Sequence, residues 1–228
     1  MALAQQPNEP AFAEEQRLPM SYDEFLAWAD EDVHAEWANG EVIVFMPPST
    51  KHQLVSGFLS TLLLLFARAF NLGEVLTAPI EMRAKPDGAA REPDILFLKT
   101  AHRERLTAQR LLGPADLVVE VVSSESVRRD RDDKFYEYEQ AGITEYLIID
   151  PRAGKERVDF YRLAEGGKYL AILPDREGRY HSTILPGFWF HPDWFWQEAM
   201  PDPLLTLAQI APEALTAVLA ALEKHRGQ

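Results

Sequence analysis

The sequence predicts a mixed α/β (α+β) domain in which helices flank one central mixed sheet. Two observations carry this expectation: runs of branched aliphatic residues suit buried strands, and a long apolar pattern of helical period precedes the clearest of them. That clearest run is ADLVVEVV at residues 115–122, and the helical pattern covers residues 50–70. Because the 228 residues contain no repeats or low-complexity blocks, we expect one domain with short extensions.

The first predicted elements are a short helix and a hairpin. Ser21 and Glu24 have the spacing of a capping box, which predicts a helix that begins near Tyr22. Asn39 and Gly40 then stand between two semi-apolar arms. This dipeptide is the strongest short-range signal for a β-hairpin, so the arms are expected to form paired strands.

The long helical pattern is expected to bury one face in the core. Its apolar positions recur at helical spacing and are Leu54, Phe58, Leu62, Leu65 and Phe66. The longest apolar stretch, which begins after Phe58, is interrupted by Arg68 and is too short to span a bilayer. We therefore expect no association with a membrane.

Strands and helices follow in mixed order along the rest of the chain. The predicted strands are residues 74–84, 91–99, 115–122 and 144–151, a hairpin turning on residues 166–167, and short strands at 181–184 and 188. A helix from Ser126 to Gln140 follows the third of these strands. It is expected to stop at Gly142, because glycine is a typical residue at a helix C-terminus.

Three parts of the chain differ in character. Residues 1–17 have neither a basic start nor a continuous apolar core, so we expect a disordered tail and no signal peptide. Residues 18–199 hold the predicted domain. Residues 200–228 carry an amphipathic helical pattern, apolar at Leu204, Leu207, Leu215, Val218 and Leu222. Such a helix packs on a second copy, forming a homodimer, or caps its own core, which is the commoner role.

The composition narrows the compartment and the partners. The absence of cysteine removes disulfides, thiolate metal sites and cysteine nucleophiles, and it fits a reducing compartment, so a cytoplasmic protein is expected. A net charge of −13 argues against an extended basic surface that grips nucleic acid. A local cleft can still carry the opposite sign from the total charge.

One carboxylate stands inside the strongest strand pattern. Side chains alternate along a strand, so Val118, Glu120 and Val122 share one face, while Leu117 and Val119 share the other. Apolar residues on both faces indicate a covered, central strand. A buried carboxylate must be paired, protonated or bound to a metal. A structural ion pair with a Lys or Arg from a packed helix is therefore the alternative to a functional role.

Further polar residues are placed so that they can converge on this carboxylate. Asp94 follows a proline at the mouth of another apolar strand, and Asp130 and Lys134 share one face of the helix after Glu120. Paired carboxylates are the hard oxygen ligands that Mg²⁺ and Mn²⁺ prefer, and a nearby ammonium helps to orient or deprotonate water. For Asp130 and Lys134 taken alone, a surface salt bridge between positions i and i+4 is the alternative.

Several motifs in order resemble a known family. PD opens one strand at residues 93–94, VEVVS follows at 119–123, and D-x-x-x-K-x-x-x-Y-x-x-x-G-I-x-E-Y-x-x-x-D-P begins at Asp130. The early segment EWANGEVIVFMPPSTKH and the late segment LPGFWF are similar as well. From Pro19 to Trp194 the chain thus resembles the Uma family of restriction endonuclease-like proteins, which belongs to the PD-(D/E)XK nuclease superfamily.

The resemblance implies a restriction endonuclease-like core and a metal-dependent endonuclease that hydrolyses phosphodiester bonds of DNA with Mg²⁺ or Mn²⁺. It assigns Asp94 and Glu120 as catalytic metal ligands, with the backbone carbonyl of Val121 as a third ligand. The superfamily pattern has a lysine two positions after the acid, where this chain has Val122. Since valine carries no charge, the simplest expectation is that Lys134 on the next helix supplies the lysine function.

Three further residues are candidates for supporting roles. Glu36 opens a hairpin arm and is expected to bind the metal or to hold its ligands. His52, near the start of the long helix, is expected to contact a phosphate or support the ligands, and Asp130 faces Lys134. For Glu36 and His52 a helix cap or an exposed position is the alternative. Other members of the motif are expected to hold helix and strand together: Tyr138, Glu145 and Tyr146.

Two other classes of function compete with a nuclease. A glycosidase also uses two carboxylates, but it usually lines a larger barrel with aromatic side chains. A binding or regulatory module that keeps the fold after its chemistry has faded is the stronger rival, because Val122 and the net charge of −13 both favour it. The joint presence of Asp94, Glu120 and Lys134 favours the enzyme, since a structural role does not require that set.

Overall fold

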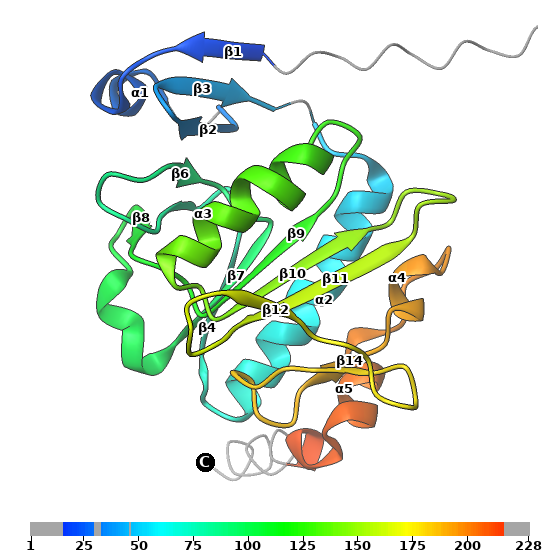
Figure 1. The fold of residues 1–228 in the computed structure, drawn as a ribbon. Coiled ribbons are helices and arrows are strands. Elements are labelled where there is room, and N and C mark those ends of the chain that lie inside the picture. Colours follow the sequence, from blue (N-terminus) through cyan, green and yellow to red (C-terminus); the bar gives the residue numbers. More distant parts are fainter. Residues whose placement is uncertain (1–15, 30–32, 46, 217–228) are drawn as a thin grey trace, which may run out of the picture.

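The computed structural model describes residues 16–29, 33–45 and 47–216 (Figure 1). In this part of the chain two six-stranded sheets and one two-stranded sheet form. The fold is mixed α+β with a central mixed sheet, as predicted. A second six-stranded sheet accompanies the central one, which the sequence did not predict.

The central sheet has the strand order β12-β11-β10-β9-β7-β4. Its strands are β4 (Gly73–Thr77), β7 (Ile95–Lys99), β9 (Leu117–Val121), β10 (Glu145–Asp150), β11 (Arg157–Leu163) and β12 (Tyr169–Ala171). Strands β9 and β10 are parallel, and the other neighbouring pairs are antiparallel.

The second sheet, here called the N-terminal sheet, has the order β1-β3-β2-β6-β5-β8. Its strands are β1 (Gln16–Pro19), β2 (Ala35–Ala38), β3 (Glu41–Val44), β5 (Glu81–Arg83), β6 (Ala90–Arg91) and β8 (Arg110–Leu112). The predicted hairpin is confirmed as β2 and β3. Its two turn residues, Asn39 and Gly40, have φ values of 53° and 81°, the left-handed pair that a type I′ turn requires.

The helices lie on both faces of the central sheet (Figure 1). They are α1 (Tyr22–Trp28), α2 (Thr50–Ala69), α3 (Lys134–Ala141), α4 (Asp193–Trp196) and α5 (Pro203–Ile210), with a 3₁₀ segment η1 (Thr100–Arg105) and a π-helical segment η2 (Arg129–Asp133). The small sheet pairs β13 (Tyr180–His181) with β14 (Trp189–Phe190). Leu117 and Val119 of β9 join the core beneath α2, whereas Val118 and Val122 join the core that contains Tyr138 of α3. Alternation along β9 therefore directs Glu120 toward α3.

Two prolines mark the places where the chain passes between the sheets. Residues 74–84, predicted as one strand, divide into β4 and β5 with Pro79 between them. Residues 91–99, also predicted as one strand, divide into β6 and β7 around Pro93. Proline cannot donate to a strand ladder, so each crossing ends one strand before the next begins. The second crossing leaves Asp94 at the start of β7, where the two sheets meet.

Helix α1 begins as its sequence predicts. Glu24 donates its backbone N–H to the Ser21 hydroxyl, and the Glu24 carboxylate accepts from the Ser21 backbone N–H at 2.8 Å. Both halves of the predicted capping box are thus confirmed, and they satisfy N–H groups that the first turn leaves without a helical partner.

Helix α2 forms where predicted and buries most of its predicted apolar face, including Phe58, but not Leu54. Leu59, Leu62 and Phe66 are at most 1% exposed, whereas Leu54, expected in the core, is 45% exposed. At 100° per residue, position 54 points about 80° to 140° away from these three side chains. The expectation for Leu54 was therefore wrong.

The whole of α2 is longer than its most apolar stretch. By length and composition alone, the complete helix could span a bilayer. The prediction that this segment is too short to do so therefore holds for its most apolar stretch and not for the whole of α2. Its inward face packs with β7, β9 and β10 in one hydrophobic cluster. This packing is that of a core helix in a globular domain.

The helix predicted from Ser126 to Gln140 is not uniformly α-helical. The five residues of η2 precede α3, which begins at Lys134. The predicted stop is confirmed, because Gly142 caps α3 with φ of 84°. Glycine adopts this left-handed conformation without a steric penalty.

The C-terminal segment does not form the single helix predicted for it. Helix α5 ends at Ile210, and Ala211 breaks the helical geometry with φ of −147° and ψ of 79°. Leu207 is 1% exposed and joins the core beneath α2, so the described part of this segment caps its own core. Val218 and Leu222 lie outside the described residues, and a homodimer stays a prediction.

At the other end of the chain, the predicted tail and the first strand overlap. Gln16 and Arg17, expected in the tail of residues 1–17, pair with Val44 and Ile43 of β3. Residues 1–15 lie outside the described part of the structure. The N-terminal sheet thus begins two residues before the predicted domain boundary.

The orientation of α2 yields a matched pair of stability measurements. Leu62→Ala should lower the free energy of unfolding by about 2–5 kcal/mol, because it leaves a cavity at a fully buried position. Leu54→Ala, the same substitution on the exposed side of the same helix, should change it by less than about 0.5 kcal/mol. Urea unfolding followed by circular dichroism compares the two, and equal losses would contradict the assigned face.

Candidate functional site

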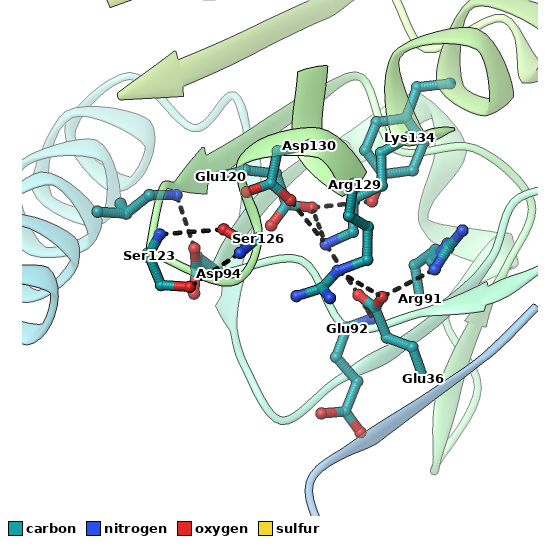
Figure 2. A network of polar contacts seen from close by, with 12 residues as sticks. Glu36, Arg91, Glu92, Asp94, Glu120, Ser123, Ser126, Arg129, Asp130 and Lys134 are labelled. Carbon is teal, nitrogen blue, oxygen red and sulfur yellow. Dashed lines mark hydrogen bonds and ion pairs between the residues drawn. The ribbon is translucent and has the colours of Figure 1, made fainter. Parts of the chain in front are cut away.

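A cavity of about 1260 Å³ opens where the N-terminal sheet, the first turn of α2 and the end of β9 meet. All the residues that the sequence predicted for the site line this cavity: Glu36, His52, Asp94, Glu120, Val121, Asp130 and Lys134. Figure 2 shows the carboxylates and Lys134 of this set in a polar network with Arg91 and Arg129. Residues more than eighty positions apart in the sequence therefore share one site.

The two strand carboxylates lie on neighbouring strands of the central sheet. Ile95 of β7 pairs with Val119 of β9 in antiparallel register, which places Asp94 across from Glu120. Asp94 Oδ2 accepts a hydrogen bond from the Val121 backbone N–H at 2.7 Å. Because both strands are paired on each side, the sheet holds the two carboxylates in fixed relative positions.

Lys134 lies beside Glu120, on the side of β9 that faces α3. Its Nζ is 2.9 Å from Glu120 Oε1, 2.8 Å from Glu36 Oε1 and 3.5 Å from Asp130 Oδ1. Lys134 is 2% exposed and Asp130 is 1% exposed. The alternative of a surface salt bridge between them is therefore wrong. An ammonium stands next to the strand acid although Val122 occupies the usual lysine position.

The π-helical segment η2 turns two consecutive side chains, Arg129 and Asp130, into the site. Both are buried, whereas consecutive residues of an α-helix point about 100° apart. Tyr146 Oη donates to the backbone carbonyl of Asp130 at 2.8 Å and secures the segment on β10. Single π-helical turns inside α-helices are frequently found at functional sites.

Glu36 is the meeting point of the positive charges. Besides Lys134, its carboxylate accepts from Arg91 Nη1 at 2.9 Å and from the Glu92 backbone N–H at 3.1 Å. Burial by itself raises the pKa of Glu36, but Lys134 and Arg91, together with Arg129, hold it at about 2. Glu36 is 0% exposed, so the alternatives of a helix cap or a surface position are wrong.

The remaining carboxylates are less well compensated. Burial raises the pKa of Glu120 to about 8, and the negative charges of Asp130, Asp94 and Glu36 add to this effect while Lys134 opposes it. Burial also raises the pKa of Asp130. Asp130 lies 3.5 Å from the Lys134 ammonium, which opposes this effect only in part. The fold therefore favours the protonated forms of Glu120 and Asp130, whereas a bound cation would favour their ionised forms.

The donor set fits a hard divalent cation of the Mg²⁺ type. Among the described residues, no three Asp, Glu or His side chains already surround one point as ligands. Mg²⁺ does not need such a cage, because it usually keeps several waters and binds one or two carboxylates. Asp94, Glu120 and Val121 line the cavity and offer hard carboxylate and carbonyl oxygens there, with the Asp130 carboxylate nearby.

His52 and Tyr138 support the two strand carboxylates. His52, in the first turn of α2, lies with Nε2 3.2 Å from Asp94 Oδ2. Burial lowers the pKa of His52, but the hydrogen bond and charge of Asp94 outweigh it and raise the pKa. Tyr138 Oη donates to Glu120 Oε1 at 2.9 Å, so this tyrosine contacts the site as well as packing α3. Glu145, by contrast, binds Ser182 and Thr183 outside the cavity.

The sequence did not reveal three charged residues of the network. Arg91 forms a bidentate pair with Glu137 at 2.7 and 2.8 Å while contacting Glu36. Glu92 and Arg129 line the cavity. The available signal was adjacency, because Arg91 and Glu92 precede Pro93-Asp94 and Arg129 precedes Asp130. A run of charges such as RRDRDD ordinarily indicates an exposed surface, and only the π-helical turn directs part of it inward.

One comparison with known proteins shows a family, and another shows a shared fold. The family model Uma2, described as "Putative restriction endonuclease", matches residues 22–197. The crystal structure of "a putative nuclease belonging to DUF820 from Anabaena variabilis ATCC 29413" is similar with a TM-score of 0.62 and 14% identity, covering 78% of this chain and 98% of that one. At this identity the likeness shows a common fold alone. The curated proteins contain no match.

The buried ammonium predicts a large effect on stability. Lys134→Met should lower the free energy of unfolding by about 3–5 kcal/mol, because it leaves buried carboxylates without their cation. Adding Glu36→Gln should recover part of this loss, since the two side chains interact directly. Lys168→Met, which removes an exposed partner of Glu139, should leave stability nearly unchanged. Similar losses in urea unfolding for both lysine variants would contradict the assigned role of Lys134.

Glu92 predicts a pH dependence of stability. Burial raises its pKa to about 8, with Glu36 and Glu81 adding repulsion. The fold favours the protonated form, so ionisation costs stability progressively between about pH 4.5 and pH 8. Glu92→Gln should therefore be as stable as wild type at pH 4 and more stable by a few kcal/mol at pH 8, where the difference levels off. Thermal unfolding across this range tests it, and a difference that shrinks with rising pH would contradict it.

Proposed function

This chain belongs to the Uma2 family of putative restriction endonucleases, and on that basis we propose that it is a metal-dependent endonuclease that hydrolyses phosphodiester bonds of DNA. The observation that carries the proposal is the meeting of Asp94, Glu120 and Lys134 at one cavity. Two carboxylates and one ammonium are the chemical groups that such hydrolysis needs. Here they come from β7, β9 and α3, elements that the fold brings together.

The residues divide the work of this reaction among them. Asp94 and Glu120, with the Val121 carbonyl, would hold Mg²⁺ or Mn²⁺. When bound, such an ion acts as a Lewis acid at the phosphate and makes a coordinated water more acidic. The Lys134 ammonium contacts Glu120. It thereby supplies positive charge near the bound phosphate, whose negative charge increases during hydrolysis. Burial lowers the pKa of Lys134, but Glu120, Glu36 and Asp130 outweigh it and keep the group an ammonium.

Two side chains position the metal ligands. His52 orients the Asp94 carboxylate through its 3.2 Å contact, and Tyr138 orients Glu120 through its hydroxyl. Partners of this kind fix the direction of a ligand and tune its basicity. Glu36 acts one step further away, because it holds Lys134 and Arg91 in place.

A second candidate is a module that has kept the fold and lost the chemistry. One observation favours it: the Lys134 ammonium is already within 3.5 Å of three carboxylates, as a purely structural cation would be. The position of Asp94 and Glu120 at the wall of the cavity favours the enzyme, because a purely structural ion cluster does not need to face an open space.

Cleavage with matched variants separates these functions. Wild-type protein with Mg²⁺ or Mn²⁺ should cut a panel of single- and double-stranded DNA, and Asp94→Asn and Glu120→Gln should lower the rate by at least about a hundredfold, since each removes a ligand charge. Glu139→Gln, on the same helix as Lys134 but away from the cavity, should cut like wild type. If no variant differs from wild type, or if nothing is cut and calorimetry detects no Mn²⁺ binding, the faded module is the better description.

The assignment of Lys134 has its own readout in the same assay. Lys134→Ala should abolish cleavage while still binding DNA, after circular dichroism has confirmed that the variant is folded. Full activity of Lys134→Ala beside an inactive Glu120→Gln would show that another group performs the lysine function.

A further inference from the structure

The cavity has two chemically different sides. Toward the central sheet it is lined by the carboxylates and Lys134 described above. Toward the N-terminal sheet its lining holds the apolar and aromatic side chains Leu18, Trp28, Val33, Val44 and Phe45, beside the polar Gln16, His34 and Glu36. A nucleotide has the same division, because its base has apolar faces and its phosphate is charged.

Trp28 is the most exposed aromatic side chain on the apolar side. It is the last residue of α1, lines the cavity and is 39% exposed. A tryptophan exposed to this degree at the wall of a site is an available surface for stacking. Base stacking on an aromatic side chain contributes about 1–3 kcal/mol per base and tolerates any sequence.

Arg129 connects the two sides of the cavity. Its guanidinium carbon lies 4.7 Å above the centre of the Phe45 ring, and its Nε is 3.6 Å from Glu36 Oε2. The side chain is 7% exposed, so packing determines its conformation. A guanidinium presents its donors in one plane, the geometry in which arginine binds phosphate.

The charges of the cavity disfavour a duplex as the group that enters it. Its lining contains seven Asp or Glu residues and four Lys or Arg residues. Of these four, Lys134 is surrounded by carboxylates and Arg152 pairs with Asp150 at 2.7 Å. Duplex DNA keeps its base faces inside and is held largely through phosphates. With so few cations, the cavity must gain its binding energy from base faces, and only an unpaired strand exposes these.

We propose that the site binds an unpaired DNA strand, with a base stacked on Trp28 and a backbone phosphate on Arg129 seated over Phe45. This inference rests on the proposed nuclease function and names its substrate class. It assigns a role to the N-terminal sheet and α1, which contribute the stacking wall, whereas the central sheet contributes the reacting groups. Trp28 and Arg129 are then binding residues for the strand.

Binding is measured without cleavage, using fluorescence anisotropy of a labelled DNA oligonucleotide in EDTA, single-stranded or annealed to its complement. Wild type should bind the single strand at least about tenfold more tightly than the duplex. Trp28→Ala should weaken single-strand binding about 5- to 100-fold. Arg129→Gln should weaken it and reduce the dependence of affinity on salt by about one phosphate contact. Tyr136→Ala, an exposed aromatic residue on α3 away from the cavity, should bind like wild type.

Melting temperatures show first that each variant is folded. Equal or tighter binding of the duplex, or wild-type affinity in both Trp28→Ala and Arg129→Gln, would overturn the inference. Its failure is distinguishable from failure of the proposed function. Metal-dependent cleavage of duplex DNA without single-strand preference would disprove this inference and leave the proposed hydrolysis standing. Trp28-dependent single-strand binding without cleavage by any metal would disprove the proposed hydrolysis and leave this inference standing.

Discussion

The Lys134 ammonium is the interaction on which the rest of the site depends. Glu36 comes from the N-terminal sheet, Glu120 from the central sheet and Asp130 from η2, and all three face the same Nζ. Buried carboxylates at such short range repel one another strongly, because the interior screens charge poorly. One cation therefore joins the two sheets and the π-helical segment at the point where the cavity opens. The same charge that the fold requires for stability is the charge that a phosphodiester hydrolase requires at its reacting centre.

This arrangement is compatible with the proposed function although Val122 stands where the resemblance leads one to expect a lysine. Val122 lies on the same face of the central sheet as Glu120, and there it packs with Tyr138 and Tyr146 of the adjoining core. Helix α3 packs on this face, and its Lys134 contacts Glu120. The apolar packing of α3 therefore also places the Lys134 ammonium. Tyr138 of the same helix donates a hydrogen bond to Glu120 while its ring packs in the core. Loss of the strand lysine leaves the acid with a cation, so the valine is compatible with an intact site.

Much of the local structure followed from the sequence, since the determining interactions are local. The capping box of α1, the Asn39-Gly40 turn and the Gly142 stop each depend on residues within a few positions of one another. Alternation along β9 also gave the correct direction of Glu120. Non-local packing overrode the pattern elsewhere. Leu54 fits the helical period but lies on the exposed side of α2, and the segments around Pro79 and Pro93 fit single strands but divide between two sheets.

The order of motifs by itself determined the family and predicted Asp94, Glu120 and Lys134 as site residues, because residue type and spacing along the chain are sufficient for these. The tertiary structure alone decided which charges meet. Arg91, Glu92 and Arg129 read as ordinary surface residues, and the pairing of Glu36 with Lys134 spans almost a hundred positions. These side chains become buried and meet their electrostatic partners only in the folded chain, where the two sheets and η2 come together. A local pattern therefore predicts the candidate groups, whereas folding sets their ionisation and the shape of the cavity around them.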